Sequence, residues 1–346
     1  MIAIITGVTG QDGSYLAELL LEKGYEVRCA VRRTSHQLSK THLGPLMDKV
    51  KIYECDLTDQ SSLFQLFEGL TGDTSFEVYN LGALSQVGTS FECPRTTFEI
   101  NTLGTLNILE VIRLKDLIKV CKFYQASTSE MFGKVHDIPQ HEETPFHPRS
   151  PYGVSKLAAH WIVQNYRESY DLFACSGILF NHESPRRGEY FVTQKIVTQL
   201  GEVLRGQREF MEIGNLEARR DWGHAKDCVK AMWMMLQHEK PDDYVVATGV
   251  ECSVRQFIEK VLNFHDLKIK WEGKGINEVG KLGNNVIVKT SEKYYRPCEV
   301  DRLLGDSRKI RKVLDWHPTY TIDDLISEMI QNKIPKLETG TMNACV

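Results

Sequence analysis

Short apolar runs alternate with amphipathic stretches through the first 180 residues of the chain. The runs with the length of buried strands lie at 2–6, 26–31, 51–54, 76–81, 122–126 and 173–179. Helix-like segments lie between them, at 14–23, 60–69, 101–113 and 153–170. Strands that alternate with helices at this spacing predict βαβ units, and right-handed crossovers place helices on both faces of a parallel sheet. The pattern therefore predicts a doubly wound α/β domain of the Rossmann type, with ligands beyond the carboxyl ends of the strands.

The alternation is interrupted after residue 180 and returns with a predicted helix at 225–238 and a strand at 243–247. Further predictions are helices at 251–264, 306–315 and 321–331, and a Gly/Asn-rich loop at 272–285. We expect one domain from 1–180 plus 225–250. We expect a second, smaller α/β domain from 181–224 plus 251–335, interleaved with the first, and a polar tail at 336–346.

Composition narrows the class of protein. The 346 residues are 42% hydrophobic and 25% charged, which is typical of a globular protein in water. A formal net charge of −4 provides no basic field for nucleic acid or an anionic membrane surface. The apolar runs are shorter than the roughly 18–20 residues of a membrane-spanning helix, and Met1–Gly7 predicts a strand and turn instead of a signal peptide. We expect no partner that is a nucleic acid or a membrane.

Nine cysteines occur, and none of them forms a C-x-x-C pair. Several lie in apolar, strand-like surroundings, which is typical of buried, reduced thiols. Their spacing favours neither a disulfide framework nor a zinc site, so we expect a cytoplasmic protein without a metal.

A glycine-rich turn follows the first predicted strand and opens the first helix. Its residues are Gly7, Val8, Thr9, Gly10, Gln11, Asp12 and Gly13, with G-x-x-G-x-x-G spacing. Such glycines permit a tight turn and a close approach of the backbone to a pyrophosphate, which the helix N-terminus then binds. Gly7, Thr9, Gly10, Gln11, Asp12 and Gly13 are therefore predicted to hold a dinucleotide; the alternative is a turn without a ligand.

The end of the second strand predicts which dinucleotide is bound. A site selective for NAD places a carboxylate there to bind the ribose 2′-hydroxyl. This chain has Arg32, Arg33, Thr34 and Ser35 instead. Guanidinium groups bind a 2′-phosphate with paired, charge-assisted hydrogen bonds, so we predict NADP. The alternative is a solvated basic loop.

Tyr152 and Lys156 are four residues apart at the start of a predicted helix and share one face of it. We expect the Lys156 ammonium to lower the pKa of Tyr152, so that the phenol exchanges a proton with a substrate hydroxyl while NADP takes a hydride. Lys156 also reaches the nicotinamide ribose. The spacing alone is common, and its alternative interpretation is an exposed polar face.

Thr128 and Glu130 follow the fifth predicted strand, at the sheet edge where the ligand belongs. A hydroxyl at Thr128 can bond the reacting oxygen. Oxidation of an alcohol requires no carboxylate at position 130, whereas a carboxylate there suits removal of a proton next to a carbonyl. The alternative is that Glu130 only caps the following turn.

These features together resemble the extended short-chain dehydrogenase/reductase family, and within it the branch of GDP-mannose 4,6-dehydratases. The resemblance extends from Met1 to about Gln331. Its most specific segments are 7–13, 124–133, 151–156, 179–188, 216–227 and 294–301.

The resemblance implies a redox-neutral conversion of GDP-D-mannose to GDP-4-keto-6-deoxy-D-mannose, on the route to GDP-fucose or GDP-rhamnose. It implies that NADP takes a hydride from C4 while Tyr152 removes the O4 proton. Glu130 then takes the C5 proton and helps water to leave from C6, to which NADPH returns the hydride. It also implies a homo-oligomer, either a homodimer or a homotetramer.

The resemblance further assigns contacts. Those to NADP are Asp56 and Leu57 at the adenine, Leu81, Gly82, Ala83 and Ser85 along the cofactor, and His182 and Arg187. Those to the sugar nucleotide are Ser85, Thr128, Glu130, Asn181, Lys195, Arg220, Arg296 and Glu299. Without the resemblance, the arginines would be read as solvated surface and His182 as a structural histidine.

Two other functions remain open at this point. The first is a C4 epimerase or a 4-keto reductase of nucleotide sugars, neither of which needs a base at Glu130. The second is a catalytically silent redox sensor that binds NADP and controls a partner protein.

Overall fold

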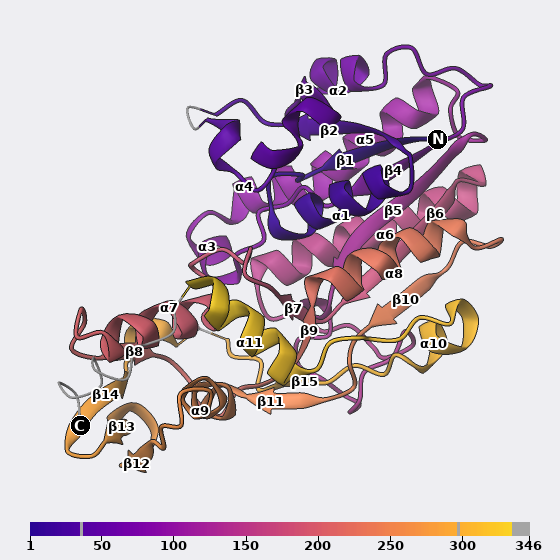
Figure 1. Ribbon diagram of the computed structural model, residues 1–346. Coiled ribbons are helices and arrows are strands. Elements are labelled where there is room, and N and C mark those ends of the chain that lie inside the picture. Colours follow the sequence, from indigo (N-terminus) through magenta and orange to yellow (C-terminus); the bar gives the residue numbers. More distant parts are fainter. Residues whose placement is uncertain (35–36, 296–297, 334–346) are drawn as a thin grey trace.

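A computed structural model describes residues 1–34, 37–295 and 298–333 (Figure 1). A seven-stranded sheet forms its larger part, in the order β10-β6-β5-β4-β1-β2-β3. The strands are β1 (Ile2–Thr6), β2 (Glu26–Val31), β3 (Lys51–Glu54), β4 (Phe76–Asn80), β5 (Cys121–Thr128), β6 (Phe173–Leu179) and β10 (Asp243–Val246). Every neighbouring pair is parallel, which confirms the predicted doubly wound sheet.

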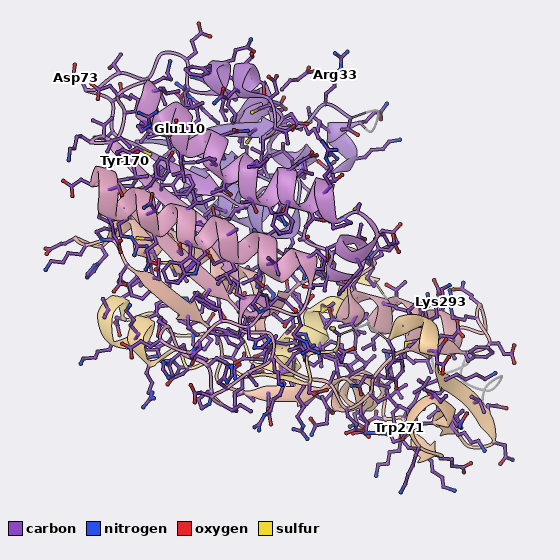
Figure 2. All side chains as sticks on the ribbon, turned by 180° about the vertical axis from the view of Figure 1, so that it is seen from behind. Arg33, Asp73, Glu110, Tyr170, Trp271 and Lys293 are labelled. Carbon is purple, nitrogen blue, oxygen red and sulfur yellow. The ribbon has the colours of Figure 1, made fainter. Side chains whose placement is uncertain are left out.

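Helices cover both faces of this sheet because successive strand residues point to opposite sides. The main helices are α1 (Gln11–Glu22), α2 (Gln60–Leu66), α5 (Gly104–Leu114), α6 (Pro151–Tyr170) and α8 (Ala225–Gln237). Smaller helices are α3 (Val87–Glu92), α4 (Pro94–Phe98) and α10 (Arg308–Leu314). On one face Tyr79 packs in a core with Leu16 of α1 and Met232 of α8. On the other face Val78 packs with residues of α2, α5 and α6, and Figure 2 views the molecule from that side.

A smaller second part has its own core and lies at one end of the molecule (Figure 1). Its helices are α7 (Val192–Leu204), α9 (Val254–Asn263) and α11 (Ile322–Lys333). A four-stranded sheet joins β12 (Lys270–Glu272), β13 (Val279–Leu282), β14 (Asn285–Thr290) and β8 (Met211–Ile213). A second small sheet joins β7 (Asn181–Glu183), β9 (Arg219–His224), β11 (Glu251–Ser253) and β15 (Arg302–Leu303).

The prediction of a loop at 272–285 is wrong, because this segment contains β13 and the turn into β14. Gly280 lies within the strand, where a Cβ atom would come 2.4 Å from Ile269 Cδ1. The glycine is therefore required for close packing against a side chain and does not mark a turn there. Gly283, with φ +58°, does form the turn.

The two parts meet at the ends of β5 and β6 in the large sheet. The strands β7 and β9, which pair with each other in the second small sheet, lie at this junction. Loop residues that follow parallel strands in this position line a crevice. Within the described part of the chain, no helix combines the length and the apolar character that crossing a membrane requires.

Candidate active site

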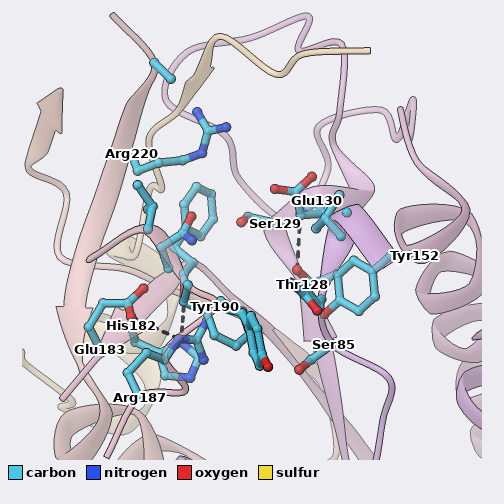
Figure 3. A pocket seen from close by; sticks show the side chains of 18 of the residues that line it. Ser85, Thr128, Ser129, Glu130, Tyr152, His182, Glu183, Arg187, Tyr190 and Arg220 are labelled. Carbon is cyan, nitrogen blue, oxygen red and sulfur yellow. Dashed lines mark hydrogen bonds and ion pairs between the residues drawn. The ribbon is translucent and has the colours of Figure 1, made fainter. Parts of the chain in front are cut away.

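A cavity of about 600 Å³ opens between the carboxyl ends of the large sheet and the smaller part. In Figure 3, Ser85, Thr128, Glu130 and Tyr152 lie on one wall, and His182, Glu183, Arg187 and Arg220 lie on the opposite wall. The predicted residues that line it are Asp12, Leu81, Ala83, Ser85, Thr128, Glu130, Tyr152, Lys156, Asn181, His182, Arg187, Lys195, Arg220 and Glu299. One cavity thus brings together residues that lie far apart in the chain, from Asp12 to Glu299.

Other predicted residues lie outside the cavity lining: Gly7, Thr9, Gly10, Gln11, Gly13, Arg32, Arg33, Thr34, Asp56, Leu57 and Gly82. Ser35 and Arg296 fall outside the residues that the structure describes.

Tyr152 and Lys156 are oriented by the way in which α6 begins. The Ser150 hydroxyl accepts a hydrogen bond from Gly153 N at 3.0 Å, and Pro151 occupies the first helical position. Tyr152 therefore lies in the first turn, and Lys156 lies one turn later on the same face. The Lys156 amine donates to the Ala126 carbonyl oxygen at 3.0 Å, on β5. Both side chains are buried, so the interpretation of an exposed polar face is wrong.

The expectation that Lys156 lowers the pKa of Tyr152 is wrong for this structure. Burial raises the pKa of Tyr152 to about 12, against an opposing hydrogen bond to Thr128. Burial also lowers the pKa of Lys156 to about 8, because a desolvated ammonium is unfavourable. Desolvation is therefore the largest influence on the pKa of both groups.

Thr128 ends β5 and caps the short 3₁₀ turn Ser129–Met131 that follows it. Its hydroxyl oxygen accepts a hydrogen bond from Glu130 N at 3.2 Å. The capping side chain is thus that of Thr128, and the Glu130 side chain lies at the cavity wall (Figure 3). Glu130 belongs to the cavity lining even though it is only 8% exposed.

Adjacent arginines have different surroundings. The Arg187 guanidinium lines the cavity and lies over the Phe191 ring. Its Nε is 2.9 Å from Glu183 Oε2. Glu183 is 1% exposed and also accepts from the Thr193 hydroxyl at 2.7 Å. Sequence reasoning missed Glu183, because it ends β7 and a turn follows it, where a spacing of four residues does not indicate an ion pair as it does in a helix.

Arg186 has a structural role on α1. It pairs with Glu18 at 2.6 Å, donates to the Ser14 hydroxyl at 3.0 Å and covers the Tyr15 ring. These contacts hold the segment after β7 against α1, away from the cavity lining.

The remaining cations lie on the wall formed by the smaller part. Arg220 of β9 is 6% exposed and lies 3.6 Å from Glu299 through one guanidinium nitrogen. Lys195, in the first turn of α7, places its amine 3.1 Å from the centre of the Tyr294 ring, and burial lowers the pKa of Lys195 to about 8. Two cavity aromatics, Tyr190 and Tyr294, were not predicted as site residues, although Tyr294 begins the segment 294–301 that the resemblance marks as specific.

The glycine turn leaves no room for side chains. A Cβ atom on Gly7, where φ is +70°, would come 2.8 Å from Gly82 N, and one on Gly13 would come 2.4 Å from the Gly7 carbonyl oxygen. Gly10 is the N-cap of α1 and supplies no side-chain cap. At Gly7, Gly10 and Gly13 the turn therefore presents backbone without side chains near the N-terminus of α1, which fits a dinucleotide phosphate.

Beyond this turn, Arg32, Arg33 and Thr34 are exposed immediately after β2. Asp56, which follows β3, accepts from Thr58 N at 2.9 Å. Burial opposes ionisation of Asp56, but its bonds to Thr58 and the Arg32 guanidinium lower its pKa overall. Arg32 and Asp56 thus lie close to one another, beyond the carboxyl ends of β2 and β3. This is the edge of the sheet at which a dinucleotide is expected.

His182 connects β7 to the glycine turn. Its Nε2 lies 2.7 Å from Asp12 Oδ2, and its Nδ1 lies 2.8 Å from the Phe180 carbonyl oxygen. Gln11 donates to the His182 carbonyl oxygen at 3.2 Å and accepts from the Ser184 hydroxyl at 2.8 Å. The side chains of Gln11 and Asp12 therefore bind protein groups on the opposite wall.

Comparison with known proteins identifies similar sequences along almost the whole chain. Residues 4–329 match the family model described as GDP-mannose 4,6 dehydratase. The chain is 50% identical over 348 residues to the GDP-mannose 4,6 dehydratase of Homo sapiens, covering 98% of this chain and 93% of that protein. It is 48% identical over 351 residues to the GDP-mannose 4,6-dehydratase of Vibrio cholerae, and this alignment covers 96% of this chain and 93% of that protein.

Solved structures share the fold. The RMD protein of Pseudomonas aeruginosa, complexed with NADPH, aligns with a TM-score of 0.75 and 22% identity, covering 96% of this chain and 98% of that one. UDP-glucose 4-epimerase of Thermus thermophilus, complexed with NAD, aligns with a TM-score of 0.80 and 23% identity, covering 97% and 100%. These likenesses confirm the fold class.

Proposed function

Because the chain belongs to the GDP-mannose 4,6-dehydratase family, we propose that it binds NADP and converts GDP-D-mannose to GDP-4-keto-6-deoxy-D-mannose. The enzyme class is that of a hydro-lyase acting on a nucleotide sugar. The observation that carries the proposal is a carboxylate, Glu130, on the same cavity wall as Thr128 and Tyr152 (Figure 3). A hydroxyl, a phenol and a carboxylate on one wall are the groups that oxidation followed by elimination requires.

NADP, when bound, supplies the reversible hydride chemistry of this reaction. We propose that the turn of Gly7, Thr9, Gly10, Gln11, Asp12 and Gly13 holds its pyrophosphate. The 2′-phosphate contacts are assigned to Arg32, Arg33, Thr34 and Ser35. Asp56, Leu57, Leu81, Gly82, Ala83, Ser85, His182 and Arg187 complete the proposed cofactor site. The preference for NADP over NAD is supported by two guanidinium groups directly after β2, where an NAD site places a carboxylate.

Tyr152 is the proposed acceptor of the O4 proton. Burial favours its protonated form, whereas the Thr128 hydroxyl and the Arg187 guanidinium favour the phenolate. Thr128 also lies where it can hold the sugar oxygen. Lys156, fixed at Ala126, supplies a further cation one helical turn away.

Glu130 is the proposed base for the proton at C5. A carbonyl at C4 acidifies that proton, and the same carboxyl group then protonates the leaving hydroxyl at C6. Each such proton transfer contributes roughly 10²–10⁴ in rate. Asn181, Lys195, Arg220, Arg296 and Glu299 are proposed to hold the nucleotide and its diphosphate, which arginines bind in paired fashion.

We also propose that 1–180 plus 225–250 bind the cofactor and that 181–224 plus 251–335 bind the sugar nucleotide. A homo-oligomer, either a homodimer or a homotetramer, is supported by exposed apolar side chains on neighbouring helices, including Leu114 of α5 and Trp161 of α6 at 55% and 54% exposure. The cysteines of the described segments are free, which supports a cytoplasmic location. The product would serve the synthesis of GDP-fucose or GDP-rhamnose.

The test is incubation of the purified protein with GDP-mannose and a catalytic amount of NADP, followed by mass spectrometry of the nucleotide sugar. Loss of one water without accumulation of NADPH is the expected result. An unchanged mass with an altered sugar would indicate a C4 epimerase. A second incubation, with a 4-keto nucleotide sugar and stoichiometric NADPH, would indicate a reductase if the sugar gained two hydrogens while NADPH was oxidised. Absence of any conversion in a protein that binds NADP would favour a redox sensor.

A further inference from the structure

Both ring nitrogens of His182 face atoms that only accept hydrogen bonds. Nδ1 lies 2.8 Å from the Phe180 carbonyl oxygen, and Nε2 lies 2.7 Å from Asp12 Oδ2. A neutral imidazole has one N–H group and one lone pair, so it satisfies only one such acceptor. The geometry therefore requires protons on both nitrogens, which makes the ring an imidazolium.

His224 shows the contrasting arrangement in the same protein. Its Nε2 also faces a carboxylate, that of Glu328, at 2.9 Å. Its Nδ1, however, accepts a hydrogen bond from Lys226 N at 3.0 Å and so carries no proton. A nearby carboxylate alone does not make a buried histidine cationic; the second acceptor at His182 does.

The charged and titratable groups around His182 come from three elements. Asp12 of α1 supplies the negative charge, and its other oxygen accepts from the Gln11 amide at 3.0 Å. Cys228 of α8 interacts with the ring, and burial raises the pKa of its thiol, so it adds no charge. Arg187, beyond β7, acts on Asp12. Burial disfavours a charged ring, but Asp12 raises the pKa of His182 well above its ordinary value.

This ion pair joins the two walls of the cavity. Asp12 lies in the first turn of α1, directly after the glycine turn, whereas His182 lies in β7, between Asn181 and Glu183. The hydrogen bonds of Gln11 to His182 and Ser184 run parallel to it. The position of the glycine turn relative to Arg187 therefore depends on this pair.

We propose that His182 is a positioning residue: as an imidazolium it holds Asp12 and the glycine turn against β7, and it offers the cofactor neither a free N–H nor a lone pair. The proposal rests on the proposed binding of NADP at that turn. It changes the role that the resemblance implied for His182, from a direct contact to action through Asp12.

The protonation state is tested by NMR of the full chain with ¹⁵N-labelled histidine. Long-range proton–nitrogen spectra at pH 7.5 are expected to show two protonated nitrogens for His182 and one for His224, with signals assigned from the H182Q and H224Q variants. In D12N an amide replaces the carboxylate; its N–H bonds Nε2, its oxygen still accepts from Gln11, and His182 becomes neutral. A neutral His182 in the unaltered protein would overturn the proposal.

The positioning role is tested by isothermal titration of NADP into the unaltered protein and D12N. We expect about tenfold weaker binding by D12N, because the variant keeps the hydrogen bonds and loses the charge pair. Unchanged affinity in D12N would also overturn the proposal. If the unaltered protein failed to bind NADP, the proposed cofactor would be wrong, and the NMR result would still decide the charge of His182.

Discussion

The Lys156 amine donates a hydrogen bond of 3.0 Å to the carbonyl oxygen of Ala126. This bond ties α6 to β5 two residues before Thr128, at the edge of the sheet where the cavity lies. Lys156 is 4% exposed, so its charge faces a backbone carbonyl at considerable cost in desolvation. It places Lys156 within the wall that also carries Tyr152.

The buried Lys156 makes stability depend on pH. Its pKa falls from 10.5 to about 8 on folding, so between those values the unfolded chain binds more protons. Stability contributed by this group therefore rises with pH from about 8 to about 10.5 and is lowest below pH 8. We expect the free energy of unfolding of the unaltered protein, relative to Lys156→Met, to rise by up to about 3 kcal/mol between pH 7 and pH 10.5. Urea denaturation of both proteins at several pH values measures this difference in the free energy of unfolding. If the free energies of the two proteins changed with pH in parallel, the prediction would be wrong.

Glu130→Gln tests the proposed base. The amide is similar in size but accepts no proton at C5, so we expect conversion of GDP-mannose to fall by roughly 10²–10⁴. NADP binding should stay within error of the unaltered protein, because the backbone of position 130 and its bond to Thr128 are kept. Turnover is measured by mass spectrometry and NADP binding by titration calorimetry. Elimination at the original rate in this variant would refute the role of Glu130.

Two adjacent arginines form a matched pair for mutation. Arg187→Ala removes a cation from the cavity and leaves Glu183 buried without its partner, so we expect NADP binding to weaken at least about tenfold. Arg186→Ala removes contacts to Glu18 and Tyr15, so we expect a loss of about 1 kcal/mol in stability and unchanged NADP binding. Calorimetry and urea denaturation separate the effects. Similar NADP affinities in the two variants would contradict the assignment of Arg187.

The packing of the glycine turn predicts a large effect at Gly13. In Gly13→Ala, a Cβ atom 2.4 Å from the Gly7 carbonyl oxygen must displace backbone, so we expect roughly 2 kcal/mol or more of destabilisation and loss of NADP binding. Gly72→Ala is the control, since nothing lies within 4 Å of its added Cβ. Thermal unfolding and NADP titration compare the two. Equal stability of Gly13→Ala and Gly72→Ala would show that the turn is not closely packed.

Prediction succeeded where the signal is local. The strand at 2–6, the glycine turn after it and the helix after that follow from residue periodicity and the backbone freedom of glycine, and β1 and α1 occupy those positions. Prediction failed at 272–285, because Gly280 serves a contact with Ile269 that sequence spacing does not reveal. Glycine marks a turn at Gly7, after β1, and a close contact with a side chain at Gly280, within β13.

The sequence by itself determined the doubly wound sheet, the glycine-rich turn after its first strand and the candidate residues of the site, because periodicity, turn residues and motif spacing are properties of neighbouring positions. The resemblance had selected Arg187 over Arg186, but only the tertiary structure shows what separates them: Arg187 pairs with Glu183 at the cavity, and Arg186 pairs with Glu18 on α1. It also buries Tyr152, which raises the pKa of that phenol, and places an acceptor at each ring nitrogen of His182. Desolvation and the identity of hydrogen-bond partners arise only when distant segments pack together, so no local pattern contains them.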